Sequence, residues 1–276
     1  MAFGKSGSMP IRRIHIAFSL AALAGLASCG GDSDGTVTGS HTAFPTTQAN
    51  LTDGNAPTFA RFAELAARAG ATMRLGEFMV PVAGNTFSDG GCGAIGAGQA
   101  TVVLSASTGS VTGTATYTTF DRCFNMLVNG TASLDGTMQA GGEIDTMNFS
   151  FTSLAFTSAS ETIQAAGTAA LNWTSALGAS SYLITLNATS SGTASFKVDN
   201  FLVGSQLTAG TENIFISGRL TTSDGFVDIA TVISPQLFVP STGLQGGQVT
   251  MTGVSTTATV TYNGPIAPTI SIAPRP

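Results

Sequence analysis

Residues 149–156 read Phe-Ser-Phe-Thr-Ser-Leu-Ala-Phe, and residues 196–203 read Phe-Lys-Val-Asp-Asn-Phe-Leu-Val. In both stretches apolar and polar residues alternate, the alternation slips by one position, and it then resumes. Alternation is typical of a half-buried β-strand, because successive side chains point to opposite faces. One extra residue in a strand is what a β-bulge inserts, and a bulge bends the strand and increases its twist. Both stretches therefore predict strongly bent strands, and residues 115–120 form a fainter third copy.

Each copy is followed by a second kind of element, in which two alternating apolar residues precede a glycine. These elements lie at 126–130, 163–167, 214–218 and 249–253. Their unequal spacing disfavours a solenoid, which needs a fixed period. We interpret them as successive strand pairs whose glycines permit close approach or sharp coiling, the alternative being that glycine is simply common in this chain. The prediction is an all-β fold: a bent antiparallel meander, either an open barrel or a two-layer sandwich.

One short N-terminal helix is expected over residues 57–69. Asn55 is a suitable N-cap, Pro57 fits the first turn and Gly70 would end the helix. An apolar stripe on one face predicts packing against the core, and Glu64 and Arg68 are spaced to pair at i,i+4. The stripe consists of Phe59, Phe62, Leu65, Ala66 and Ala69.

The start of the chain is typical of an exported protein. Lys5, Arg12 and Arg13 precede an apolar run at 14–27 that is shorter than the ~17–25 residues of a membrane-spanning helix. Residues 26–29, Leu-Ala-Ser-Cys, resemble the lipobox of bacterial lipoproteins. That resemblance implies that Cys29 is joined by a thioether to diacylglycerol and becomes the mature N-terminus. It further implies a Gram-negative envelope, and Gly30 in place of Asp favours the outer membrane.

Three regions follow from this interpretation. Residues 1–28 form a signal peptide, residues 29–55 form a flexible tether rich in Gly, Ser and Thr, and residues 56–276 form a single all-β domain. All fifteen acids but only seven of the ten basic residues follow the cleavage point, so the mature chain has a net charge of −8. Such a chain would repel phosphates, so nucleic acid is not an expected partner.

The sequence offers few residues for catalysis. His41, in the tether, is the one histidine after the cleavage point, which argues against Ser-His-Asp or Cys-His catalysis and histidine metal ligation. Carboxylates remain, in the pairs Glu143/Asp145 and Asp224/Asp228, but solvated surface and an Asp-Gly hairpin turn explain them better. Residues 32–35 resemble only part of a calcium loop. We therefore expect neither enzyme activity, nor a metal site, nor a cofactor.

Cys92 and Cys123 are predicted to form a disulfide, since the periplasm is oxidising. They lie nearly symmetrically about a turn at 107–110, which would place them at the open end of a hairpin. A redox pair usually has the spacing Cys-x-x-Cys, which is missing here.

The lipobox, the tether, the cysteine pair and residues 214–231 together resemble uncharacterised β-rich lipoproteins of Gram-negative envelopes. That resemblance implies no catalytic residues. Two hypotheses follow: a non-catalytic, outer-membrane-anchored module that binds a partner protein or has a structural role, and a carrier that holds a lipid or other apolar ligand in a curved sheet. A pocket wide enough for a ligand, rather than one filled by Tyr117, Phe151 and Phe196, would distinguish the carrier.

Joint replacement of Cys92 and Cys123 by Ala should lower the free energy of unfolding by about 3–4 kcal/mol, because the disulfide closes a loop of roughly 30 residues in the unfolded chain. Urea unfolding measures this difference. Alkylation of the denatured protein supplies the control: both thiols should react after reduction and neither before it. Reaction of both thiols without reductant would contradict the pairing.

Overall fold

The computed structural model describes most of the chain from residue 43 onward. The described residues are 43–73, 85–88, 98–107, 109–121, 126–138, 144–158, 161–174, 179–190, 194–208, 211–232, 237–238, 246–264 and 267–276.

Within these residues the chain forms one α-helix followed by fourteen β-strands. In chain order they are α1 (Ala56–Thr72), β1 (Asn85–Ser88), β2 (Gln99–Ser107), β3 (Ser110–Phe120), β4 (Leu127–Met138), β5 (Ile144–Thr157), β6 (Thr162–Thr174), β7 (Ala179–Ser190), β8 (Ser195–Thr208), β9 (Thr211–Thr222), β10 (Gly225–Thr231), β11 (Leu237–Phe238), β12 (Gln248–Thr252), β13 (Thr256–Thr261) and β14 (Thr269–Pro274).

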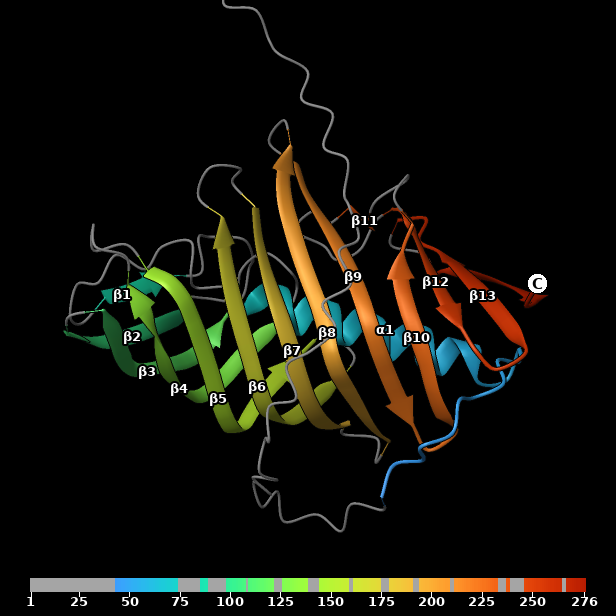
Figure 1. Cartoon of the computed structure of the whole chain (residues 1–276), viewed down its shortest axis with the longest axis horizontal. Coiled ribbons are helices and arrows are strands. Elements are labelled where there is room, and N and C mark those ends of the chain that lie inside the picture. Colours follow the sequence, from blue (N-terminus) through green and yellow to red (C-terminus); the bar gives the residue numbers. More distant parts are fainter. Residues whose placement is uncertain are drawn as a thin grey trace, which may run out of the picture. The chain divides into compact units, whose positions relative to one another are not determined.

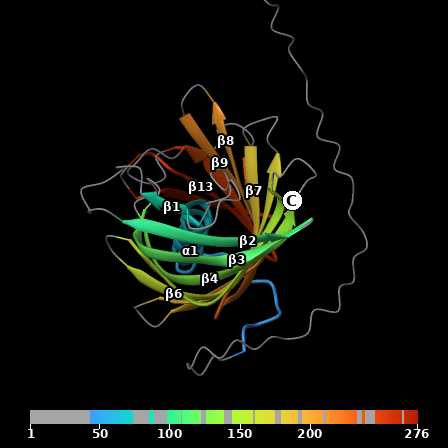
Figure 2. The same ribbon diagram turned by 90° about the vertical axis from the view of Figure 1, so that its left-hand side faces the viewer.

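The strands form a single antiparallel meander, so the predicted all-β fold is confirmed (Figure 1). Each strand pairs with the next in sequence, except that β10 pairs with β12 while the two-residue β11 pairs with β9. The described edge strands, β1 and β14, do not pair with each other, and the sheet is open. Strands β2, β3, β4 and β6 curve around α1 (Figure 2).

The predicted bulges are present in all three copies of the slipped alternation. The pairing register shifts between Tyr117 and Phe120 in β3, between Phe151 and Leu154 in β5, and between Asp199 and Leu202 in β8. In the first and third bulges one residue, Thr119 (φ 47°) or Asn200 (φ 46°), has a left-handed backbone. Each bulge bends its strand, which allows an open sheet to curve round a helix.

Three of the four repeated glycines lie beside these bulges. Gly130 pairs with Tyr117, Gly167 pairs with Phe151, and Gly218 lies across from Phe201. Their φ angles are 126°, 156° and 144°, values that L side chains rarely adopt. A Cβ at Gly218 would lie 2.7 Å from Phe201 Cα, so the missing side chain permits the close approach. The structural interpretation of these glycines is confirmed.

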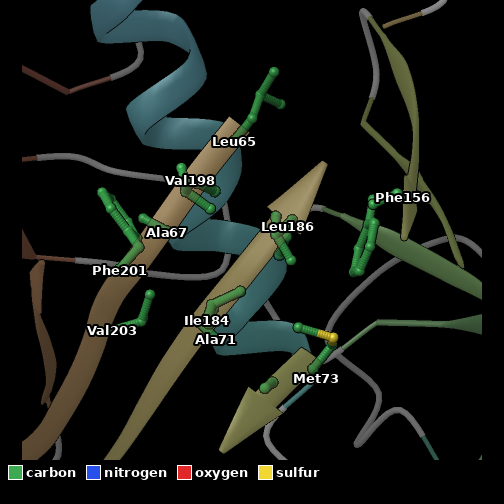
Figure 3. Packing of buried hydrophobic residues seen from close by; sticks show 14 of the residues in the cluster. Leu65, Ala67, Ala71, Met73, Phe156, Ile184, Leu186, Val198, Phe201 and Val203 are labelled. Atoms are coloured by element: carbon green, nitrogen blue, oxygen red, sulfur yellow. The ribbon is translucent and has the colours of Figure 1, made fainter. Parts of the chain in front are cut away.

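Helix α1 runs across the strands on the inner face of the sheet (Figure 1) and is buried almost all round. The whole predicted stripe is buried, and the Phe62 ring stacks on Phe196 of β8 with 4.5 Å between centroids. Figure 3 shows Leu65, Ala67 and Ala71 of the helix in one buried cluster with Leu186 of β7 and Val198 of β8. The helix thus fills the inner face as a core element.

The predicted end of the helix was wrong. Gly70 does not end α1, which continues to Thr72, with Met73 N–H donating to Ala69 O at 3.0 Å. A Cβ at Gly70 would collide with Ile184 and lie 2.9 Å from Val203 Cγ2. This glycine therefore lets the helix approach β7 and β8 closely instead of turning the chain.

The start of the helix also differs from the prediction. Asn55 occupies the N-cap position, but its side chain makes no capping hydrogen bond. Its Oδ1 instead accepts from Thr52 N–H at 2.9 Å and its Nδ2 donates to Asn50 O at 3.1 Å. Asn55 therefore orders the turn that leads into α1.

The outer face of the sheet is rich in hydroxyl groups. Exposed Thr114, Ser133, Ser150 and Thr168 pair in register across β3, β4, β5 and β6. This row, the hydroxyl row, offers hydrogen-bond donors and acceptors without ionic charge.

Gly218→Ala should lower the free energy of unfolding by more than about 2 kcal/mol, because the new Cβ meets neighbouring backbone at a strained φ. Gly109→Ala is the matched control: its φ is also positive (79°), but a Cβ there would meet nothing within 4 Å. It should cost only about 1 kcal/mol. Equal losses in urea unfolding would contradict a role for the Phe201 contact.

Candidate functional site

The predicted modification sites lie outside the described residues. This holds for Cys29, the expected lipid attachment point, and for Cys92 and Cys123, the expected disulfide. It also holds for His41 and Glu143. The described chain closest in sequence to Cys29 is the segment that precedes α1, and this segment joins the sheet at a defined place.

That place, here called the junction, is built from residues 47–51, the start of β10 and the turn between β12 and β13 (Figure 1). Gln48 forms a parallel bridge with Phe226. Ala49 N–H donates to Phe226 O at 2.8 Å, and Phe226 N–H donates to Thr47 O at 3.0 Å. Val254 N–H donates to Ala49 O at 2.9 Å, so Ala49 is bonded on both sides.

Side chains add a second layer of hydrogen bonds to the junction. Gln48 Nε2 donates to Thr252 O at 3.0 Å, and Leu51 N–H donates to Thr256 Oγ1 at 2.9 Å. Asn50 Oδ1 accepts from Ser255 Oγ at 2.6 Å. Ala49 and Leu51 are each 2% exposed, so the junction combines backbone pairing with apolar burial.

Two glycines make room for this segment. A Cβ at Gly225 would lie 2.7 Å from Thr47 O, and one at Gly253 would lie 2.6 Å from Ala49 O. Gly253, the last of the repeated glycines, therefore makes room for the junction and does not lie beside a bulge. Residues 47–51, which fall within the region predicted as a flexible tether, are instead packed onto the sheet, because their backbone groups and apolar side chains find partners there. The alternation of Gln48-Ala49-Asn50-Leu51 was the sequence signal for this.

Electrostatic interactions join Glu64 and Arg68 of α1 to Asp121 and Tyr262 in a polar cluster. Arg68 Nη1 lies 3.5 Å from Glu64 Oε1, which confirms the predicted i,i+4 pair. Arg68 and Asp121, which directly follows β3, are each 7% exposed. Tyr262, which directly follows β13, is 5% exposed. The cluster therefore connects the helix to strands near both ends of the sheet.

Burial dominates the electrostatics of this cluster. It raises the pKa of Glu64, while the positive charge of Arg68 opposes the shift. Burial lowers the pKa of Arg68, against the charges of Glu64 and Asp121. The pKa of Tyr262 is raised by burial and, to a smaller extent, by the negative charge of Glu64. Perturbed groups of this kind mark either functional sites or structural ion-pair networks.

Arg61 provides the other ionic contact of the helix. Its Nη2 lies 2.9 Å from Glu161 Oε1, between β5 and β6, and its guanidinium lies 4.9 Å from the Phe62 ring centroid. Arg61, Glu64 and Arg68 are the three charged side chains of the helix. Sequence reasoning missed the contacts of Arg61 and Arg68 with the sheet, because the partner elements are far away in sequence.

The remaining predicted carboxylates lie on the surface. Asp145, Asp224 and Asp228 are exposed. Asp224 lies in the β9–β10 hairpin turn, where its N–H donates to Thr222 Oγ1, and Asp228 pairs with Arg219 at 3.1 Å.

Among the described residues no three His, Cys, Asp or Glu side chains gather as metal ligands would. Nor does that part of the chain contain a helix with the length and apolarity that a membrane crossing requires.

No protein-family model, curated protein or solved structure matches the chain.

Glu64→Gln should be about as stable as the wild type in acid and more stable at neutral pH. Because burial raises the folded pKa, the native state binds the Glu64 proton more tightly than the unfolded chain does. That contribution is full below the unfolded pKa and is lost as the pH rises through the folded pKa. Glutamine carries no charge at either pH and avoids the loss.

Urea unfolding of both proteins, below the ordinary glutamate pKa and at neutral pH, measures this difference. Glu161→Gln is the control, because it removes a carboxylate that pairs with a different residue of α1, Arg61. If Glu64→Gln is less stable than the wild type at neutral pH, the attraction to Arg68 outweighs burial and the prediction is wrong.

Proposed function

We propose that the protein is a lipoprotein anchored in the outer membrane through Cys29, and that its β-rich domain is a non-catalytic binding or structural module. The lipobox at 26–29 supports the anchor, and Gly30 supports the outer membrane as its location. The observation that carries the proposal for the domain is that α1 fills the inner face of the sheet.

The junction supports an anchored domain. The first described backbone hydrogen bond to the sheet is made at Thr47, so residues 30–46 separate it from Cys29. A flexible linker of that length would span about 20–25 Å. The domain would thus remain close to the bilayer, and the junction would transmit any pull from the anchor into β10 and the β12–β13 turn.

The packing favours a binding or structural module over a carrier. Tyr117, Phe151 and Phe196 are each at most 5% exposed, and Phe196 is stacked under Phe62. An apolar ligand on the inner face would have to displace the helix. A stoichiometric apolar molecule in an organic extract of the purified protein would favour the carrier instead.

The outer face is available to a partner. The hydroxyl row is exposed and uncharged, and two of the charged outer side chains pair with each other, Arg219 with Asp228. Contacts made there would depend on hydrogen bonds, which carry less salt dependence than ionic contacts. Cross-linking in native envelopes followed by purification is the direct route to the partner.

Cys29→Ser should abolish acylation and release the protein from the membrane fraction, because serine lacks the thiol that forms the thioether. Metabolic labelling with a fatty acid and fractionation of the envelope measure the two effects. Cys92→Ser is the matched control: it removes a thiol outside the lipobox and should leave labelling and fractionation unchanged. A wild-type protein that is membrane-bound, uncleaved and unlabelled would overturn the proposal.

A further inference from the structure

The sequence contains two Asn-Gly pairs, Asn129-Gly130 and Asn263-Gly264. In such a pair the backbone nitrogen of the glycine can attack the asparagine Cγ. A C–N bond forms, the bond from Cγ to Nδ2 breaks, and ammonia leaves. The glycine N–H proton is transferred through solvent to the departing amide nitrogen, which completes the ammonia, and water then opens the succinimide ring to aspartate or isoaspartate. Glycine favours the attack because it has no side chain to hinder the approach.

Asn263 lies where this reaction is least hindered. It is exposed, and it follows the end of β13 in the connection to β14. Gly264 has a φ of 84°, and a Cβ built on it would meet nothing within 4 Å. The Asn263 amide makes a long hydrogen bond, 3.4 Å from Nδ2 to Thr269 Oγ1.

Asn129 is also followed by a glycine, but it lies within a paired strand. It lies within β4, where it pairs with Ala155 while Gly130 pairs with both Tyr117 and Leu154. Its Oδ1 accepts from Thr119 N–H at 2.8 Å. A Cβ at Gly130 would lie 2.7 Å from Ser153 O, so the neighbouring backbone leaves little room for movement. Attack at this site requires the strand to open first.

We propose that Asn263 is a site of spontaneous deamidation, and that the fold protects Asn129. The reaction needs only water. It adds a negative charge beside edge strand β14 and, in the isoaspartate product, an extra backbone methylene in the β13–β14 connection. The anchored protein would then carry a surface modification that accumulates with age.

The test compares both sites in one molecule. The full-length protein is incubated in mildly alkaline buffer, sampled over days, digested, and analysed by peptide mass spectrometry that separates aspartate from isoaspartate. Asn263 should convert at least about tenfold faster than Asn129, since the strand must open before attack at Asn129. Asn263→Gln should abolish the signal from this peptide and leave Asn129 unchanged.

Incubation in urea gives the reference, because both pairs should convert at similar rates once the sheet is unfolded. The proposal is overturned if the folded protein converts Asn129 as fast as Asn263. It is equally overturned if Asn263 stays intact in the folded protein while it converts in urea.

Discussion

The packing of α1 against the inner face of the sheet is the contact on which the rest of the structure depends. An open sheet leaves one apolar face without a second sheet to cover it, and a 17-residue helix is marginal alone in water. The helix covers the apolar face of the sheet, and the sheet stabilises the helix. Burial of a Phe side chain contributes about 1.5–3 kcal/mol, and Phe59, Phe62, Phe196 and Phe201 are all almost fully buried here.

This contact explains Gly70. Glycine inside a helix costs about 1 kcal/mol relative to alanine, whereas overpacking a core costs typically 1–3 kcal/mol. Because Ile184 and Val203 lie directly beneath, a side chain at position 70 would overpack the core, and glycine avoids that cost. The helix is therefore weakened locally so that it can lie closer to β7 and β8.

Curvature could be predicted from sequence, because its causes are local. A bulge and its neighbouring glycine each give a recognisable sequence pattern within a few residues, as in Phe149–Phe156 and at Gly130, Gly167 and Gly218. Gly70 looked like a helix terminus because the contact that requires it comes from strands more than a hundred residues later. The burial of Arg68 beside Asp121 was hidden for the same reason, and the junction joins residue 49 to residues 226 and 254. What sequence reasoning missed was contact between distant segments, and those contacts make up much of the candidate site.

The edge strands of an open sheet can pair with strands of other chains. The two described edges offer little for such pairing: β1 has four residues, and β14 ends at Pro274 with Pro268 just before it. Proline cannot donate to a new strand, and short edges offer little to pair with. Because α1 fills the inner face and both described edges are short or end in proline, the outer face with its hydroxyl row is the described surface on which we propose that a partner would bind. In the proposed binding mode a partner would contact the hydroxyl row through directional hydrogen bonds, since the row itself carries no ionic charge.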